Sequence, residues 1–285
     1  MGMLQIPTPI RRPLGKLRAV GRRMVIWRRV KRNLSGATTE DARILANAIR
    51  RSPSTVWNDL DQWQFPMVEE DCTVIVKGIG QFHVRAWTDD LFHALPNQEP
   101  AVERAVRACL MPGHVFVDAG ANIGYYTILA SKLVGATGSV TAIEMMPDTA
   151  AILRRHLALN TADNVDVVEA ALSDIAGETV TASVPPGKFG QASLVDTNSG
   201  SRVSVSTTTL NDVLRNVPRV ALMKLDVEGV EIRALEGAGD ALTHIDAIIF
   251  EAWGAATDAS IFLQANGFYI EALDGRNKLA VNGRA

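Results

Sequence analysis

The chain has 285 residues, of which 47% are hydrophobic and 21% are charged, values close to the average of globular proteins. This composition excludes a disordered chain, a collagen-like fibre and a small disulfide-stapled fold. The net charge is only −2, but ten Lys and Arg fall within residues 1–32, whereas residues 33–285 hold 19 basic against 31 acidic residues, a net charge of −12. Because nucleic-acid binding depends on Lys and Arg at phosphates, we expect no nucleic-acid partner.

Residues 1–70 are predicted to form a basic helical extension. Apolar residues recur in its first half at steps of three or four, the pattern of one helix face: Leu14, Leu17, Val20, Met24, Trp27, Val30 and Leu34. Gly36 ends this helix, and a second amphipathic helix runs from Thr39 to Arg50 before Pro53 ends it. Two interpretations fit the first helix. Residues 10–34 make a peripheral membrane contact, or their apolar stripe packs on the body or on a second subunit of a homodimer.

From residue 71 the helical pattern gives way to strands. Residues 71–98 are predicted to form a small strand hairpin or cap, and residues 99–285 the large domain, where helices and strands alternate. Strands are expected at 114–119, 139–144, 165–171, 220–226, 246–251, 268–272 and 278–282, and helices at 99–110, 123–134, 148–160, 208–216, 229–239 and 256–266. The predicted fold class is therefore α/β, with a doubly wound, seven-stranded, mostly parallel sheet behind an N-terminal helical and hairpin extension.

A buried strand that ends in an acid and is followed by two glycines is the strongest chemical signal. Asp118 ends this strand, and Gly120 and Gly124 lie in the turn that opens the next helix. Small residues there let a ligand approach the backbone, and the helix N-terminus offers free N–H groups. Glu144 ends the following strand, where it can accept hydrogen bonds from ribose hydroxyls. The pattern predicts a nucleoside-binding site.

Two other interpretations of this turn were weighed. The glycines can serve packing alone, as in many strand-to-helix turns. A dinucleotide fold would need glycine at the positions that Asn122 and Tyr125 occupy. The carboxylate of Asp118 would also repel a pyrophosphate, whereas it would attract a cationic amine or sulfonium.

Five segments together resemble a known family. They are Asp-Ala-Gly-Ala-Asn-Ile-Gly-Tyr-Tyr-Thr at 118–127, Glu144, Ala-Ala-Leu-Ser-Asp at 170–174, Lys-Leu-Asp-Val-Glu-Gly-Val-Glu at 224–231 and Leu-Glu-Gly-Ala at 235–238. In this combination the chain resembles the FkbM family of S-adenosylmethionine-dependent O-methyltransferases over residues 99–273. The resemblance implies a class I methyltransferase, Rossmann-like fold, S-adenosylmethionine as cofactor, and methylation of hydroxyls on sugars, glycans or polyketide-type natural products.

The resemblance also implies roles for individual residues. Asp118, Gly120, Asn122 and Gly124 would shape the methionine pocket, Glu144 would hold the ribose, and Ala171, Leu172 and Ser173 would border the adenine. Tyr125 and Thr127, at the start of the helix, are further cofactor-binding candidates. A small-molecule or glycan acceptor is the implied partner.

The segment 224–228 has its own chemical interpretation. Lys224 and Asp226 share one face of a strand, and Glu228 follows its carboxyl end, where open α/β sheets bind ligands. Methylation of a hydroxyl needs a proton acceptor, for which Asp226 is the first choice and Glu228 the second. Lys224 is expected to orient the substrate oxygen or favour the ionised carboxylate, and Glu251 to form a third wall of the acceptor site.

Two alternatives remain open for this segment. The charges can pair with one another at a solvated strand end, without a catalytic role. Asp226 and Glu228 can instead hold a divalent metal, since carboxylate oxygens suit magnesium, although no third ligand follows at close spacing. Metal dependence is therefore left open.

The loop 185–196 lies between the expected adenine side and the catalytic strand. It is rich in turn formers, and Gln191 and Ser193 are predicted to bind hydroxyls of the acceptor. An ordinary surface crossover is the alternative. His83 and His93 are further groups that could reach the site from the cap.

The sequence also bears on compartment and on competing functions. Cys72 and Cys109 lack the CxxC spacing, and no stretch is apolar enough for a signal peptide or a membrane span. We therefore expect a cytoplasmic protein, either free or peripheral to a membrane. Besides an O-methyltransferase, we considered a cofactor-binding adaptor without turnover and a nicotinamide-dependent oxidoreductase.

Overall fold

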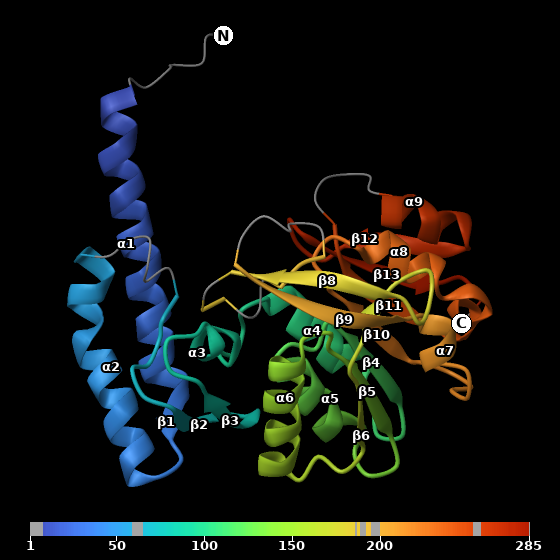
Figure 1. Cartoon of the computed structure of the whole chain (residues 1–285). Helices are drawn as coiled ribbons and strands as arrows, with labels where there is room; N and C mark the ends of the chain where they lie inside the picture. The colour runs from blue at the N-terminus through green and yellow to red at the C-terminus, as the bar shows by residue number, and fades with distance from the viewer. Residues whose placement is uncertain are drawn as a thin grey trace. The chain divides into compact units, whose positions relative to one another are not determined.

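The structure of the chain is a computed structural model that describes residues 8–58, 65–185, 187–188, 192–194, 200–252 and 258–284; for residues 8–17 and 54–58 it describes the backbone alone. The chain divides after Pro96 into two compact units, here called the N-terminal unit (residues 1–96) and the C-terminal unit (residues 97–285) (Figure 1). The three-part domain division expected from the sequence, with boundaries at residues 70 and 98, stays a prediction.

Two long helices and a three-stranded antiparallel sheet make up the N-terminal unit. Its elements are α1 (Thr8–Asn33), β1 (Leu34–Gly36), α2 (Thr39–Asn58), β2 (Cys72–Val76), β3 (Gly80–Val84) and α3 (Asp90–His93). The expected hairpin is present as β2 and β3, and β1, which the sequence pattern did not predict, pairs with β2 at its other edge. The strand that directly follows α1 and the hairpin therefore form one sheet.

One face of α1 packs against α2. The buried side chains of the two helices include Val20, Trp27, Val30, Ile44, Leu45 and Ala48. Met24 departs from the expected apolar stripe, because its side chain is 46% exposed. The side chains of Leu14 and Leu17 lie outside the described residues. Apart from Met24, the described residues of the stripe belong to the core of this unit.

The second helix is longer than predicted, because α2 continues through Pro53. A proline inside a helix removes the N–H that would bond the carbonyl oxygen four residues earlier, here that of Ile49. The hydroxyl of Ser52 donates to that carbonyl oxygen at 2.7 Å and satisfies it. The expected helix end at Pro53 was therefore wrong.

A seven-stranded sheet forms the centre of the C-terminal unit, with the order β12-β13-β11-β10-β4-β5-β6. Its strands are β4 (Val115–Ala119), β5 (Ser139–Ile143), β6 (Val165–Val168), β10 (Leu222–Leu225), β11 (Ala247–Glu251), β12 (Phe268–Ala272) and β13 (Asn277–Asn282). Only β13 runs antiparallel to its neighbours in this sheet. The predicted doubly wound, mostly parallel, Rossmann-like sheet is confirmed. The strand order reverses between β4 and β10, the position where such sheets bind ligands.

Helices and a 3-10 helix surround this sheet. They are α4 (Pro100–Cys109), α5 (Tyr125–Val134), α6 (Pro147–Asn160), α7 (Leu210–Val213), α8 (Glu231–Glu236), the 3-10 helix Gly239–His244 and α9 (Asp258–Ala265). Apolar side chains of α7, α8 and α9 pack in one core with Met223 and Leu225 of β10. Because side chains alternate along a strand, Lys224 emerges on the opposite face of the sheet.

No helix in the described ranges is long and apolar enough to cross a membrane.

A second sheet occupies the stretch 178–206, where no element was predicted. Strands β8 (Thr179–Val184) and β9 (Ser201–Thr208) pair antiparallel, and β7 (Ala171–Leu172) pairs parallel with β9. Their apolar residues alternate with Thr, Ser and Arg, the pattern of strands with one buried face. The expected strand 165–171 is therefore split between the two sheets, and the expected helix 208–216 is reduced to the short α7.

Candidate active site

The turn after β4 lies directly against the chain that follows β10. Gly120 has a φ of +84°, and a Cβ at this position would lie 1.8 Å from the carbonyl oxygen of Asp226. The N–H of Asp226 donates to the carbonyl oxygen of Ala119 at 2.9 Å. Backbone conformation and lack of space therefore both require glycine at position 120. This contact brings the two predicted motifs together at one edge of the sheet.

The turn also contains a buried acceptor atom, Oδ1 of Asn122. Asn122 has a φ of +50°, and its N–H donates to Oε2 of Glu144 at 2.8 Å. The side-chain Oδ1 of Asn122 is buried and has no hydrogen-bond partner among the described residues. Gly124 has a φ of +88°, and a Cβ there would lie 2.3 Å from Cδ1 of Leu153 on α6. Because a buried acceptor without a donor is costly, Asn122 marks a place where a ligand can donate.

Glu144 follows β5 and is buried against the same turn. Its Oε1 accepts the N–H of Met146 at 2.9 Å, while its Oε2 accepts that of Asn122. Two backbone bonds hold the carboxylate in a fixed orientation. The carboxylate therefore lies next to the turn after β4, at the carboxyl end of β5.

Asp118, the acid expected to favour a cationic ligand, is buried at the end of β4. Its Oδ2 accepts a hydrogen bond from the hydroxyl of Thr127 at 2.6 Å. Burial raises the pKa of Asp118, and both Lys224 and the bond from Thr127 oppose this rise. Thr127 thus contacts the carboxylate of Asp118, itself a candidate cofactor residue.

Lys224 and Asp226 form an ion pair at the end of β10, with Nζ and Oδ2 separated by 2.6 Å. The Lys224 side chain is 6% exposed and that of Asp226 is 31% exposed. Burial lowers the pKa of Lys224, but the carboxylates of Asp226, Glu99 and Asp118 outweigh burial and raise it overall. The lysine is therefore charged, and it fixes the position of the more exposed Asp226 carboxylate.

The sequence analysis missed Glu99 and Tyr126, which complete the surroundings of Lys224. The Nζ of Lys224 lies 5.2 Å from the ring centroid of Tyr126, a cation–π contact. The hydroxyl of Tyr126 donates to Oε2 of Glu99 at 3.4 Å, and Nδ2 of Asn277 donates to its Oε1 at 3.2 Å. Tyr126 lies within the segment 118–127 that resembles the family, and no other sequence pattern indicated a role for it. No local pattern connects Glu99 with β10.

Tyr125, a further cofactor candidate, is engaged with α4. Its hydroxyl donates to Oε2 of Glu103 at 2.9 Å, and its ring meets that of Tyr126 edge to face at 5.3 Å. These contacts give Tyr125 a packing role between α4 and α5. A role in cofactor binding stays a prediction.

Glu228 adopts a left-handed backbone conformation just after β10, with a φ of +52°. This conformation is uncommon for residues other than glycine and occurs often at functional sites. Burial first, then the carboxylates of Asp226 and Glu251, raise the pKa of Glu228 to about 7. Glu251 ends β11, and burial and Asp226 raise its pKa as well, against the opposing charge of Arg276. Three predicted acids thus gather at the carboxyl ends of β10 and β11.

Ser193, in the loop 185–196, reaches this group of acids. Its hydroxyl donates to the carbonyl oxygen of Glu228 at 3.4 Å. Its backbone exchanges two hydrogen bonds with Ser183 at the end of β8, at 2.9 and 3.0 Å. The structure therefore places Ser193 beside Glu228. Gln191, the other predicted acceptor-binding residue of the loop, lies outside the described residues.

The predicted adenine-bordering segment is tied to α8. Ala171 and Leu172 are buried in β7, and the hydroxyl of Ser173 donates to Oδ1 of Asp174 at 3.0 Å. Asp174 in turn forms an ion pair with Arg233 at 2.7 Å. A Cβ at Gly237 would lie 2.2 Å from the carbonyl oxygen of Ser173. The segments 170–174 and 235–238 are thus closely packed against each other. The contact of Ala171, Leu172 and Ser173 with adenine stays a prediction.

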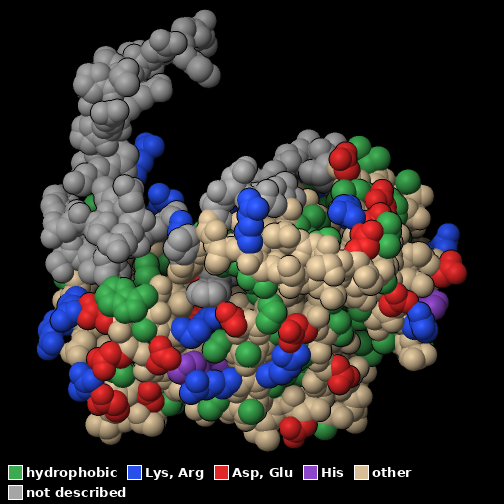
Figure 2. All heavy atoms as spheres, viewed as in Figure 1, with side chains coloured by type: hydrophobic (Ala, Val, Ile, Leu, Met, Phe, Trp, Pro, Cys, Tyr) green, Lys and Arg blue, Asp and Glu red, His purple; other side chains and the backbone are tan. Residues whose placement is uncertain are grey.

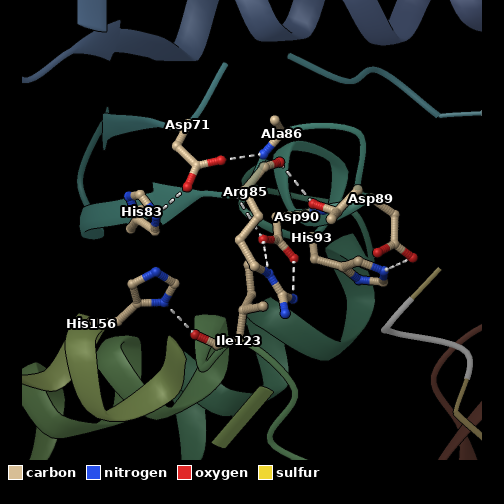
Figure 3. Close-up of polar contacts among 10 residues, drawn as sticks. Asp71, His83, Arg85, Ala86, Asp89, Asp90, His93, Ile123 and His156 are labelled. Carbon is tan, nitrogen blue, oxygen red and sulfur yellow. Dashed lines mark hydrogen bonds and ion pairs between the residues drawn. The ribbon is translucent and has the colours of Figure 1, made fainter. Parts of the chain in front are cut away.

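The two histidines weighed as site residues have partners within the N-terminal unit. The Nε2 of His93 lies 3.2 Å from Oδ2 of Asp89, and that of His83 lies 3.4 Å from Oδ2 of Asp71 (Figure 3). Their contribution to the reaction stays a prediction.

The described ranges contain no group of three or more His, Cys, Asp or Glu residues arranged to hold a metal ion.

The turn after β4 fits S-adenosylmethionine. Asn122 offers a buried acceptor with no partner among the described residues, and Gly120 lets the turn pack directly against the carbonyl oxygen of Asp226. Asp118 supplies a buried acid close to this turn, which suits a ligand that carries positive charge. Glu144 holds its carboxylate at the end of the neighbouring strand.

Residues 118–274 match the protein family described as the methyltransferase FkbM domain. The chain belongs to this family. The match begins at Asp118 and includes both motifs that meet at Gly120, so the expected family is confirmed. The protein is therefore a methyltransferase.

The individual relatives share less than 30% of their aligned residues with this chain. The chain is 28% identical over 198 residues to "Methyltransferase sdnD" of Sordaria araneosa, covering 56% of this chain and 76% of the relative. It is 28% identical over 199 residues to "31-O-demethyl-FK506 methyltransferase FkbM" of Streptomyces tacrolimicus, covering 57% and 75%. Among solved structures, the methyltransferase FkbM of Methylobacillus flagellatus aligns with 15% identity and a TM-score of 0.43, over 94% of this chain and 60% of that one.

Proposed function

We propose that the protein transfers a methyl group from S-adenosylmethionine to a hydroxyl oxygen of a sugar, glycan or polyketide-type natural product. The observation that carries the proposal is the contact between Gly120 and the carbonyl oxygen of Asp226. It joins the turn that fits a nucleoside to the carboxylates at the end of β10. The name of the Streptomyces relative describes an O-demethyl substrate, which supports oxygen as the methylated atom.

The turn after β4 and the end of β5 would hold the cofactor. Oδ1 of Asn122 accepts a hydrogen bond from it, Glu144 accepts hydrogen bonds from the ribose hydroxyls, and the buried charge of Asp118 favours its cationic end. When bound, the cofactor supplies an electrophilic methyl group. The segment 171–173 is proposed to border the adenine.

The carboxylates near β10 would take the proton of the acceptor hydroxyl. A proton acceptor must lie within hydrogen-bond reach of that hydroxyl and works best when its pKa is near the working pH. Asp226, which Lys224 holds at 2.6 Å, is the first candidate. Glu228 is the second, since its pKa is raised to about 7. Glu251, Ser193 and Gln191 are proposed to contact the acceptor.

Ligand-dependent stability and turnover test this proposal. S-adenosylmethionine should raise the melting temperature of the protein and NAD should not, because a ligand that binds the native state alone stabilises it. With labelled S-adenosylmethionine and a panel of methyl-free glycans and polyketides, one acceptor should gain the mass of a single methyl group. Stabilisation by NAD instead would favour an oxidoreductase. Cofactor binding with no S-adenosylhomocysteine formed on any acceptor would favour an adaptor.

A further inference from the structure

The exposed side of α1 carries positive charge that the described chain does not neutralise. Five exposed cations lie on its described part: Arg18, Arg22, Arg28, Lys31 and Arg32. None of them forms an ion pair with a described residue. The first acidic residue of the sequence is Glu40, beyond the end of this helix. Figure 2 shows blue Lys and Arg side chains standing along this helix at the upper left.

Three of these five cations share one face of the helix. Arg18, Arg22, Val25 and Arg32 follow one another at intervals of four, three and seven residues, so their side chains share a face. At 1.5 Å per residue, this face extends for about 21 Å. A straight row of charges of this length matches a flat surface of opposite charge.

The apolar side of α1 is already covered. Val20, Trp27 and Val30 are buried in the unit to which α1 belongs, and α1 packs against α2. This part of the predicted stripe is covered within the N-terminal unit and is therefore not free to enter a bilayer, whereas packing on the body or on a second subunit stays a prediction. Any membrane contact must use the basic side instead.

Two apolar side chains are exposed among the cations. Met24 is 46% exposed and Val25 is 53% exposed. Between lipid headgroups such side chains can leave water, whereas against nucleic-acid phosphates they gain little. The aromatic ring of this helix segment, that of Trp27, is buried and cannot stack on a base. These features favour a lipid surface over a nucleic acid.

We propose that the basic face of α1, formed by Arg18, Arg22, Arg28, Lys31 and Arg32 with Met24 and Val25 among them, binds a membrane surface rich in anionic phospholipid. The cations contact headgroup phosphates, and the two apolar side chains sit at headgroup depth. The helix lies on the surface and does not cross it. This property is independent of the proposed methyl transfer.

Sedimentation of the full-length protein with vesicles tests the proposal. The protein should pellet with vesicles of phosphatidylcholine and phosphatidylserine but not with phosphatidylcholine alone. Since each cation at an anionic surface strengthens binding about fivefold, the variant Arg18→Gln/Arg22→Gln/Arg32→Gln should bind about 100-fold more weakly. All three side chains are exposed, so the fold should be kept. The matched control Arg104→Gln/Arg155→Gln/Arg284→Gln removes the same charge from exposed positions of the C-terminal unit and should bind as the wild type does.

Each contrary outcome is informative. Equal binding by the wild type and the α1 variant, or no binding by the wild type, overturns the proposal. So does tight binding of duplex DNA or RNA at physiological salt without vesicle binding, which would assign the face to nucleic acid. The variant Met24→Ser/Val25→Ser distinguishes binding to a lipid surface from binding to a nucleic acid. It should weaken binding to vesicles severalfold, and unchanged vesicle binding would contradict contact at headgroup depth.

Discussion

Lys224 on β10 and Asp118 on β4 are register partners in adjacent parallel strands. Their side chains therefore emerge next to each other on the same face of the sheet, and both are buried, with exposures of 5% and 1%. Burial disfavours the charge on each of them. The carboxylates of Asp226, Glu99 and Asp118 outweigh burial at Lys224 and raise its pKa, whereas burial keeps the pKa of Asp118 raised although Lys224 opposes the rise. The candidate cofactor turn and the candidate proton acceptor thus share one buried cation.

Replacing that cation should destabilise the protein. In Lys224→Met, Asp118 and Asp226 lose their positive neighbour, and the free energy of unfolding should fall by about 3–5 kcal/mol, the usual effect of removing one partner of a buried pair. Urea unfolding followed by circular dichroism measures it. Adding Asp118→Asn should recover part of the loss, and Lys77→Met, at an exposed lysine, should change little. Equal losses at Lys224 and Lys77 would contradict the buried pair.

Loss of either acid at the cofactor turn should weaken cofactor binding. Asp118→Ala and Glu144→Ala should each lower the affinity for S-adenosylmethionine by about 1–3 kcal/mol, because each removes an acceptor from a buried polar contact. Isothermal titration calorimetry gives the values, with Asp166→Ala on the exposed side of β6 as the control. If both variants fold and bind as the wild type does, the cofactor lies elsewhere.

The proton acceptor can be identified by single-turnover rates. Asp226→Asn should keep cofactor binding and slow the chemical step roughly 100-fold or more, the usual contribution of a general base. Glu228→Gln should slow it less. The reverse order would make Glu228 the base. If EDTA abolishes activity and magnesium restores it, the two carboxylates are better interpreted as metal ligands.

The raised pKa of Glu228 should make stability depend on pH. A carboxyl with a raised pKa binds its proton more tightly in the folded state than in the unfolded one. The contribution of Glu228 to the free energy of unfolding is therefore fully present at a pH below 4.5, the ordinary pKa of a glutamic acid. It is lost as the pH rises through the raised pKa of about 7. Glu228→Gln should gain stability relative to the wild type across this window, as measured by urea unfolding at successive pH values. Parallel pH curves for the two proteins would contradict the raised pKa.

Alanine substitutions at two glycines with positive φ distinguish backbone strain from a steric clash. At Gly120 an added Cβ meets the carbonyl oxygen of Asp226 at 1.8 Å, whereas at Gly135, with a φ of +62°, nothing lies within 4 Å. Gly135→Ala should cost about 1–3 kcal/mol of stability from backbone strain alone, because a φ of +62° with a ψ of −170° is a conformation that essentially only glycine adopts. Gly120→Ala should cost clearly more and abolish cofactor binding. Equal unfolding midpoints in urea would show that the turn after β4 can move away from β10.

The sequence predicted the sheet of the C-terminal unit well, because its central strands are short apolar runs of the kind that parallel sheets bury on both faces. It did not predict β8 and β9, because their alternating Thr, Ser and Val residues lie in a stretch whose polarity suggested a loop. It also ended α2 too early, because proline usually ends a helix and the sequence pattern does not show that the Ser52 hydroxyl bonds the carbonyl oxygen of Ile49 instead.

The candidate site was predictable where it depends on consecutive residues. Asp118, Gly120 and Asn122 lie in one turn, and Lys224 to Glu228 at one strand end. Glu99 was not predictable, because only the packing of α4 brings its carboxylate to Tyr126 and near Lys224. Periodicity likewise assigned Met24 to the buried stripe of α1, although the helix turns it outward.

The two backbone bonds between Ser193 and Ser183 divide the connection from β8 to β9 into two independent segments. Residues inserted on one side of Ser193 would alter only that segment, since the paired serines keep the other in register. In a library that aims to change acceptor choice, the two halves of this connection can therefore be varied in length separately, with Ser193 retained beside Glu228.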